Sequence, residues 1–257
     1  MSSKPSLYER LRRLSWISVV KTVRLNFSLL PFWQAIRFPI LITRASTIAS
    51  VKGRIKITCP VKAGLIRFGF NHSDLMSWKS GKVFINIKGT WVVNGWIQFG
   101  VGSQLNIDNC ALMQTGNSTS IGANSKIICR EKIVISDFFR TGWEVQIFDT
   151  NFHYVKNMIN GNVKKRTSPV IIGKNNWVAN RVSIMQGCRT NDYLIIASNS
   201  LCNKDYSDLP HFSMIAGSPA KLCASNVYRV LDKEEREIDR LFEESGGEYI
   251  VTDTSYL

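Results

Sequence analysis

The chain has 257 residues, which is enough to bury a sizeable core and fits the length of one β-rich domain. Its net charge of +14 favours polyanionic partners such as coenzyme phosphates, acidic glycans, anionic lipid or nucleic acid, without choosing among them. The six cysteines include no C-x-x-C pair and are expected to be reduced, mostly buried thiols of a cytosolic protein. No cleavable signal peptide is expected, and no apolar run reaches the length of a membrane span.

Residues 1–44 form a basic amphipathic segment. The helical spacing of Leu7, Leu11, Leu14 and Ile17 predicts an amphipathic helix over 5–24. Two interpretations stay open: a cap that covers the first coil or packs on a neighbouring subunit, and an interfacial element that contacts anionic membrane through residues 5–38. The aromatic residues interleaved with the bases of this segment are Trp16, Phe27, Phe32, Trp33 and Phe38.

A six-residue repeat organises residues 45–225 and is clearest after Pro169. A short fixed period is typical of a parallel β-solenoid, in which each step is a short strand and a turn, and the repeated residue points inward. The register slips between Arg44 and Ile121, which indicates irregular early coils with small insertions. The predicted inward positions are Ile85, Trp91, Ile97, Phe99, Leu105 and Ala111, then Ile121, Ile127, Ile133, Phe139 and Val145, and finally Ile172, Val178, Ile184, Thr190, Ile196 and Cys202.

Two segments depart from this period. Residues 154–168 are polar and basic, and they are predicted to leave one coil as a loop excursion that is either functional or a solvated insertion. Residues 226–245 carry apolar side chains at helical spacing opposite an acidic face, which predicts a helix within a C-terminal segment 226–257.

The end of the repeat resembles a known family. Residues 169–222 contain PVIIG, a Lys-Asp pair and the motif IAGSPAK at Ile215–Lys221. This combination is similar to the last coils of the hexapeptide-repeat acyltransferases, especially the bacterial sugar and polysaccharide O-acetyltransferases. The resemblance covers residues 120–225 well. It implies a left-handed parallel β-helix, a homotrimer with active sites between neighbouring solenoids, and acetyl-CoA as co-substrate without a metal.

The segment WEVQIFDTNFHYV, at 143–155, resembles the catalytic segment of that family. The match implies that His153 is the general base, and Asp149 matches as well. Close relatives often carry a second Asp where Asn151 stands, so orientation of the imidazole is expected from Asp149, Glu144 or a backbone carbonyl. The chemistry agrees, because transfer from a thioester to a hydroxyl needs a base, which histidine suits with its ordinary pKa of about 6.5. It also needs donors for the tetrahedral oxyanion, which backbone N–H groups at a coil edge supply.

The same resemblance implies that the pantetheine arm of the coenzyme runs along the last coils, with its phosphates near lysines. Ala197, Ser198 and Asn199 replace the Gly-Ala-Gly usual in the family, and their larger side chains would narrow the path of that arm. The implied coenzyme-binding residues are Trp177, Ala179, Ala197, Ser198, Lys204 and Lys221.

The sequence therefore predicts an acetyl-CoA-dependent O-acetyltransferase of a sugar or polysaccharide precursor, located in the cytoplasm or at the inner face of the membrane. Transfer to the nitrogen of an amino sugar or nucleotide sugar is an alternative. A zinc enzyme is a second alternative, but the spacings of His72, His153 and His211, 81 and 58 residues, are not the close ones expected for convergence on a metal. A third is a non-catalytic basic scaffold for polyanions, although no nucleic-acid motif is visible.

Overall fold

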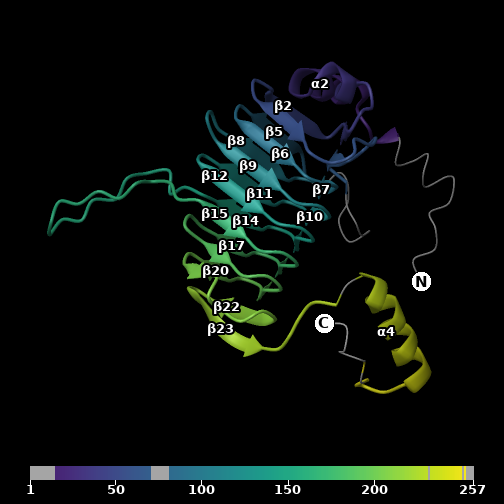
Figure 1. The fold of residues 1–257 in the computed structure, drawn as a ribbon, viewed down its shortest axis with the longest axis vertical. Coiled ribbons are helices and arrows are strands. Elements are labelled where there is room, and N and C mark those ends of the chain that lie inside the picture. Colours follow the sequence, from purple (N-terminus) through teal and green to yellow (C-terminus); the bar gives the residue numbers. More distant parts are fainter. Residues whose placement is uncertain (1–14, 71–80, 231, 251, 253–257) are drawn as a thin grey trace.

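The computed structural model describes residues 15–70, 81–230, 232–250 and 252, and it shows a parallel β-solenoid with three faces (Figure 1). Each regular coil contributes one strand to each of three sheets. The predicted all-β solenoid, with a helical segment before it and a short helix after it, is confirmed. Leu7, Leu11, Leu14 and His72 lie outside the described residues.

The strands of each sheet follow one another along the chain. Within the described residues, sheet 1 contains β1 (Ile40–Ile42), β4 (Ile66–Phe68), β7 (Ile97–Phe99), β10 (Thr119–Ile121), β13 (Arg140–Thr141), β16 (Trp177–Val178), β19 (Ile195–Ile196), β22 (Ser213–Gly217) and β23 (Ala220–Ser225). Sheet 2 contains β2 (Ser46–Ser50), β5 (Val83–Ile87), β8 (Gln104–Ile107), β11 (Lys126–Cys129), β14 (Gln146–Phe148), β17 (Ser183–Ile184) and β20 (Leu201–Cys202). Sheet 3 contains β3 (Arg54–Ile57), β6 (Thr90–Val93), β9 (Leu112–Thr115), β12 (Lys132–Ile135), β15 (Val170–Ile172), β18 (Arg189–Thr190) and β21 (Asp205–Tyr206).

The length of one coil varies along the chain. The register in sheet 2 joins Phe84 to Gln104, Gln104 to Lys126, Lys126 to Gln146 and Ser183 to Leu201, which are steps of 20, 22, 20 and 18 residues. Three six-residue repeats fit only the last value, so the longer early coils explain why the predicted register slips. The step from Gln146 to Ser183 is 37 residues, because an insertion interrupts that coil.

The core runs through the inside of the coils. Every inward position predicted from the repeat is buried, with an exposed fraction of 6% or less, so the predicted register is confirmed. Aromatic rings fill the long early coils, where Phe68 and Phe99 stack with centroids 4.9 Å apart and Trp91 meets Phe99 edge-on. The indole N–H of Trp91 donates to Thr115 Oγ1 at 3.0 Å, which satisfies its polar atom in the core.

A helix closes the first end of the solenoid. Helix α2 (Val19–Leu29) begins after Ser18, which has extended backbone angles and donates its N–H to the carbonyl of Ile42. Ile17 pairs with Thr43 as an isolated bridge, so the predicted helix over 5–24 is wrong at this point: the sheet edge takes residues 17–18. The buried Asn26 amide both donates to and accepts from the backbone of Ile40, which covers the free edge of β1.

The remaining helices are short. Helix α3 (Phe32–Ala35) follows Pro31, and helix α4 (Asp232–Ser245) begins six residues later than predicted, after an irregular stretch at 226–230. At the other end, the IAGSPAK motif forms the antiparallel hairpin of β22 and β23, which closes the last coil. Within the described residues, no helix combines the length and apolarity that a membrane crossing needs.

The six cysteines are unpaired, as predicted. Cys129, Cys188 and Cys202 are buried in the coils, and burial raises the pKa of each thiol, to about 12 at Cys202. Cys110 and Cys223 are exposed, so the prediction of mostly buried thiols is correct for the inward positions and wrong for these two turn and hairpin positions.

Candidate active site

Two edges of the solenoid carry the residues singled out from the sequence. We call the turns from sheet 1 to sheet 2 the 1–2 edge, and those from sheet 2 to sheet 3 the 2–3 edge. The 1–2 edge comprises residues 43–45, 100–103, 122–125, 142–145, 179–182 and 197–200. The 2–3 edge comprises residues 51–53, 88–89, 108–111, 130–131, 149–169, 185–188 and 203–204.

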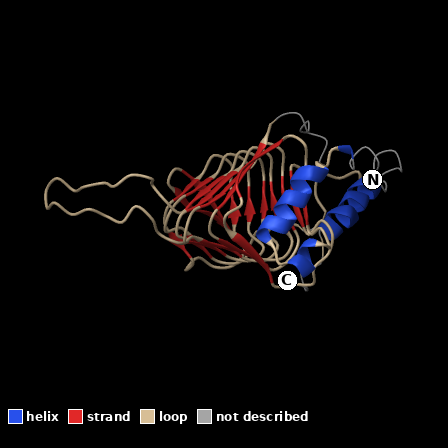
Figure 2. Cartoon of the chain, turned by 90° about the horizontal axis from the view of Figure 1, so that it is seen from above, coloured by secondary structure: helices blue, strands red, loops and turns tan. Residues whose placement is uncertain are grey.

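A two-stranded arm, residues 150–167, projects from the 2–3 edge far beyond the coils (Figures 1 and 2). Its two branches pair at Thr150 with Thr167 and at Lys156 with Val163, and residues 151–166 are all exposed. The predicted excursion falls on this arm, whose base lies four residues earlier. Its tip carries two exposed apolar side chains among asparagines, Met158 at 87% and Ile159 at 96% exposed.

Asp149 anchors the base of the arm. Its carboxylate is fully buried and accepts hydrogen bonds from the backbone N–H groups of Arg130 at 2.8 Å, and of Glu131 and Lys132 at 2.7 Å. Three backbone donors around one buried carboxylate make it a clamp on the turn of the preceding coil. Its carbonyl oxygen also accepts from the N–H of Ser168, where the arm returns. Both side-chain oxygens are therefore used within the coils, where they hold the base of the arm.

His153 stands at the start of the arm with an exposed side chain. The backbone N–H of His153 donates to the carbonyl of Asn151 at 2.7 Å, which closes a turn around Phe152. The φ of Phe152, +63°, is that of a γ-turn. The Phe152 ring meets Phe148 of β14 with centroids 5.8 Å apart, which ties this turn to the solenoid. Among the residues that the structure describes, none hydrogen-bonds the imidazole. The turn thus fixes where His153 leaves the solenoid, and its side chain is exposed.

Glu144 lies on the other edge. Its carboxylate accepts from Nε of Arg181 at 2.9 Å, and both residues line a groove of about 490 Å³ on the 1–2 edge. Gln104, Asn124 and Lys126 also line this groove. Polar side chains of this groove recur at one position of successive coils, and this recurrence was not used to predict the groove from the sequence.

The implied coenzyme residues are divided between several places. Ala179, Ala197 and Ser198 lie on the 1–2 edge, where Ser198 Oγ donates to Asn180 Oδ1 at 2.6 Å. Trp177 lies in β16 with Arg229 5.8 Å from its ring centroid. Lys204 lies on the 2–3 edge and Lys221 in β23, both exposed. One chain therefore brings Glu144, Ala179, Ala197 and Ser198 to a single edge and places His153 on the next.

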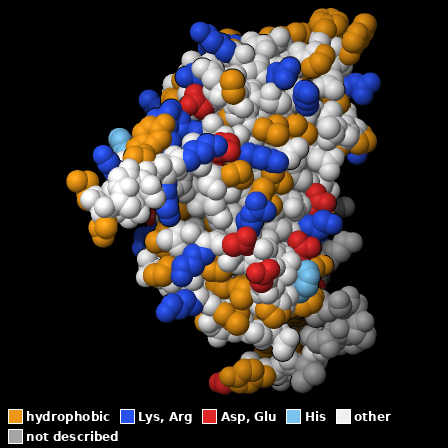
Figure 3. All heavy atoms as spheres, turned by 60° about the vertical axis from the view of Figure 1, so that its left-hand side comes forward, with side chains coloured by type: hydrophobic (Ala, Val, Ile, Leu, Met, Phe, Trp, Pro, Cys, Tyr) orange, Lys and Arg blue, Asp and Glu red, His pale blue; other side chains and the backbone are white. Residues whose placement is uncertain are grey.

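Positive charge surrounds the arm. Figure 3 looks onto this side and shows Lys and Arg side chains predominating over Asp and Glu on its upper half. Near the base, Lys165 pairs with Glu131 at 2.8 Å, and the Arg166 guanidinium lies 5.2 Å from the Tyr154 ring centroid. The bond from Lys165 holds the pKa of Glu131 below its usual value. Within the described parts of the chain, no three His, Cys, Asp or Glu side chains are grouped to hold a metal ion.

No protein-family model matches the chain, and no curated protein matches it. Solved structures do match. The polySia-specific acetyltransferase NeuO is 17% identical over 78% of this chain and 98% of its own, with a TM-score of 0.48. The polysialic acid O-acetyltransferase OatWY is 18% identical over 80% and 94%, with a TM-score of 0.42. A hexapeptide-repeat acetyltransferase from Vibrio cholerae O1 biovar eltor, in complex with acetyl coenzyme A, is 16% identical over 87% and 91%, with a TM-score of 0.33.

All three are acetyltransferases. The third carries the name of the family that the sequence resembles. The similarity to these three structures concerns the fold of the backbone.

Proposed function

We propose that this chain is an acyltransferase that moves the acetyl group of acetyl-CoA to a hydroxyl of a sugar or polysaccharide precursor. The observation that carries the proposal is the position of His153, an exposed imidazole that a backbone turn holds at the base of the arm. The family resemblance of residues 143–155 and 215–221 supports the same role.

The chemistry balances without a covalent enzyme intermediate. The imidazole of His153 takes the proton of the acceptor hydroxyl while the oxygen attacks the thioester carbonyl carbon. Backbone N–H groups at a coil edge stabilise the oxyanion of the tetrahedral intermediate. The carbon–sulfur bond then breaks, the acetyl ester remains on the sugar, and the coenzyme thiolate leaves with a proton from the imidazolium. Asp149 serves as a positioning residue in this scheme, because its bonds hold the arm from which His153 projects.

The test is release of free thiol from acetyl-CoA by the purified protein over a panel of sugars, oligosaccharides and amino sugars. Hydroxylamine treatment of the product separates the two kinds of transfer, since it cleaves an O-acetyl ester and leaves an N-acetyl amide intact. An amide product would mean that the acceptor group is an amine and not a hydroxyl. No thiol release with any acceptor would favour the non-catalytic scaffold.

We further propose a homotrimer with the site between subunits. In one chain His153 lies on the 2–3 edge, while Ala179, Ala197 and Ser198 lie on the 1–2 edge. A neighbouring copy that turns its 1–2 edge toward the arm would bring the base and the coenzyme residues together, and it would cover Met158 and Ile159. Sedimentation equilibrium is expected to give three times the chain mass, and deletion of 154–164 is expected to lower that value. A monomer with full activity would contradict the arrangement.

We also propose a peripheral contact with the inner face of the membrane, which the capping helices support. Ring contacts join Phe27 to Phe32 and Phe38, and Phe32 to Trp33. The exposed apolar side chains of this segment are Val19, Val20, Val23, Phe27, Phe32, Trp33, Ile36 and Phe38. The most exposed of these are Val20 at 78%, Trp33 at 76% and Val19 at 71%. Residues 15–70 contain nine Lys and Arg and no Asp or Glu, so this end of the molecule is cationic. Aromatic and apolar groups beside bases are typical of interfacial anchoring to anionic lipid.

The membrane contact is tested by co-sedimentation with vesicles of phosphatidylserine and phosphatidylcholine. The wild-type protein is expected to bind vesicles that contain phosphatidylserine, and Phe32→Ser with Trp33→Ser is expected to reduce the bound fraction at least about fivefold. The matched control removes two exposed aromatic residues elsewhere, Phe138→Ser with Tyr249→Ser, and is expected to bind like the wild type. Equal binding of both double variants would overturn the contact.

A further inference from the structure

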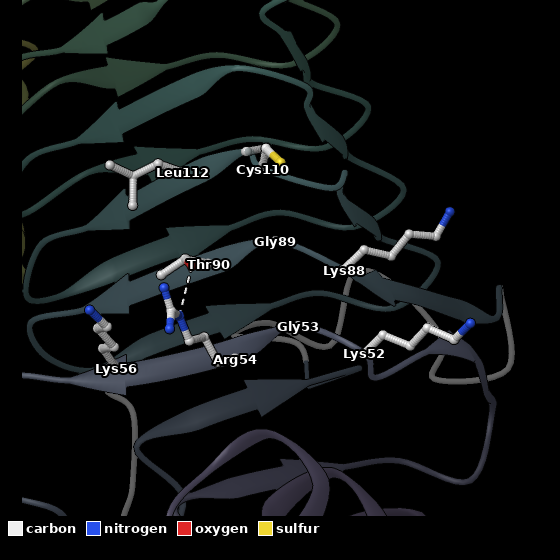
Figure 4. A pocket seen from close by; sticks show the side chains of 10 residues that line it. Lys52, Gly53, Arg54, Lys56, Lys88, Gly89, Thr90, Cys110 and Leu112 are labelled. Atoms are coloured by element: carbon white, nitrogen blue, oxygen red, sulfur yellow. Dashed lines mark hydrogen bonds between the residues drawn. The ribbon is translucent and has the colours of Figure 1, made fainter.

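A basic groove lies on the 2–3 edge, on the same edge as His153 but nearer the first coils (Figure 4). It has a volume of about 550 Å³. Its charged lining comes from Lys52, Arg54, Lys56 and Lys88. Figure 4 shows Lys52 and Lys88 extended beside each other on one side, with Arg54 and Lys56 on the other side of Gly53 and Gly89.

The register explains why these cations gather. Arg54 of β3 pairs with Thr90 of β6, so the Lys-Gly pair at 52–53 stacks on the Lys-Gly pair at 88–89 of the next coil. The glycines are required, because a Cβ at Gly53 would meet the carbonyl oxygen of Gly89, and one at Gly89 would meet those of Asp108 and Ala111. The coils therefore approach closely at this edge, and the side chains that flank the glycines define the groove.

The charge of the groove is only partly balanced within the described residues. No ion pair joins Lys52, Arg54, Lys56 or Lys88 to an acid there, and Arg54 bonds only the hydroxyl of Thr90, at 3.1 Å. Asp108 lies on the same edge and interacts electrostatically with Lys88, but its carboxylate accepts from Arg130 at 2.9 Å. Lys52 and Lys88 hold like charges side by side in neighbouring turns, and these charges repel each other. A bound anion would offset this repulsion.

The groove and the arm lie on the same edge, a few coils apart. The register continues from Thr90 to Leu112 and from Leu112 to Lys132, and the next coil along sheet 3 is the one that the arm enters and leaves. Four strand spacings separate β3 from β15, which is about 19 Å along the edge. A ligand held in the groove and extended along this edge would therefore bring a group several sugar units away close to the base of the arm.

We propose that this groove binds the carboxylate or phosphate groups of the acceptor, so that the acceptor is an acidic oligosaccharide laid along the 2–3 edge with one hydroxyl at His153. This substrate class rests on the proposed function, whereas the anion site itself stands on the groove alone. The four cations supply affinity and register for the acidic chain, and the reaction takes place at its other end.

The test separates the groove from the catalysis by measuring binding without acetyl-CoA. The probes are fluorescently labelled tetragalacturonate, its carboxyl-reduced neutral counterpart and inorganic tripolyphosphate. The wild-type protein is expected to bind the two anionic probes, with affinity falling as salt is raised from about 0.05 M to about 0.5 M, and to bind the neutral probe at least about tenfold more weakly. Anionic probes that bind no better than the neutral one would overturn the proposal.

Variants locate the site. Lys52→Gln with Lys88→Gln is expected to weaken the anionic probes by about tenfold. The matched control, Lys62→Gln with Lys174→Gln, removes two exposed charges from the turns between sheets 3 and 1 and is expected to bind like the wild type. If both double variants bind the anionic probes equally weakly, binding depends on the overall charge of the protein, and the groove is not the binding site.

Kinetics then join the groove to the reaction. In an active preparation, the groove variant is expected to raise KM for an acidic acceptor while KM for acetyl-CoA stays unchanged. A rise in KM for acetyl-CoA alone would reassign the cations to the coenzyme phosphates and overturn an acceptor site. If the wild type binds the anionic probes but releases no thiol with any acceptor, the proposed function fails and the anion site remains.

Discussion

Replacement of His153 by alanine is expected to lower the rate of acetyl transfer by about 10²–10⁴-fold, the range that a positioned general base contributes. Coenzyme binding and the circular dichroism spectrum are expected to stay as in the wild type, because the side chain is exposed and makes no hydrogen bond to the described residues. The measurement is thiol release under single-turnover conditions, combined with coenzyme binding by equilibrium dialysis. Loss of the rate with intact binding is the signature of a group that acts on the reacting hydroxyl.

His211 provides the control, since it is an exposed histidine of a turn whose ring lies beside Tyr193, away from the arm. His211→Ala is expected to keep the wild-type rate. A His153→Ala protein that transfers acetyl groups at the wild-type rate would remove the base from the proposal. A partial result can be resolved with His153→Gln, which keeps a polar side chain but cannot accept a proton at neutral pH.

Replacement of Asp149 by alanine is expected to destabilise the protein by about 3 kcal/mol, because three backbone N–H groups at 130–132 lose their acceptor in a buried place. The base of the arm should loosen at the same time, since Asp149 joins the preceding coil to the residues that begin and end the arm. The expected result is a lower urea midpoint together with a reduced rate of transfer. Urea unfolding followed by circular dichroism gives the first quantity.

Asp208→Ala serves as the matched control, because that carboxylate is exposed in a turn after β21, and it is expected to leave the midpoint unchanged. Asp149→Asn is a stricter variant. Its amide keeps one acceptor oxygen but turns an N–H donor toward backbone donors, so it should be nearly as unstable as the alanine variant. If Asp149→Asn has the urea midpoint of the wild type, the carboxylate is not what stabilises the base of the arm.

The repeat made much of the fold predictable. Ile172, Val178, Ile184, Thr190, Ile196 and Cys202 recur at six residues because the last coils have 18 residues, and each of these side chains is buried. The start of α2 was less predictable, because Ile17 fits a helical face equally well, and only the free edge of the first strands draws it into an extended bridge with Thr43.

The candidate site could be predicted only in part. The match at 143–155 identifies His153 and Asp149, but sequence alone does not tell that three backbone donors already occupy the carboxylate. The basic groove was missed for a different reason. Lys52 and Lys88 are 36 residues apart, whereas the next coils along the chain step by 22 and 20, so the recurring Lys-Gly pair follows no constant period. Its stacking becomes visible only once the register is known.

The arm interrupts a coil without disturbing its neighbours. Its ends meet at Thr150 and Thr167, and the sheets on either side keep their register, with Ile133 level with Val170 and Gln146 level with Ser183. A segment joined in this way is a removable module, since another hairpin whose ends close at the same distance would fit the same scaffold. Exchange of this one segment offers natural selection, or a protein engineer, a route to new acceptors and new assemblies that leaves the folding of the solenoid untouched.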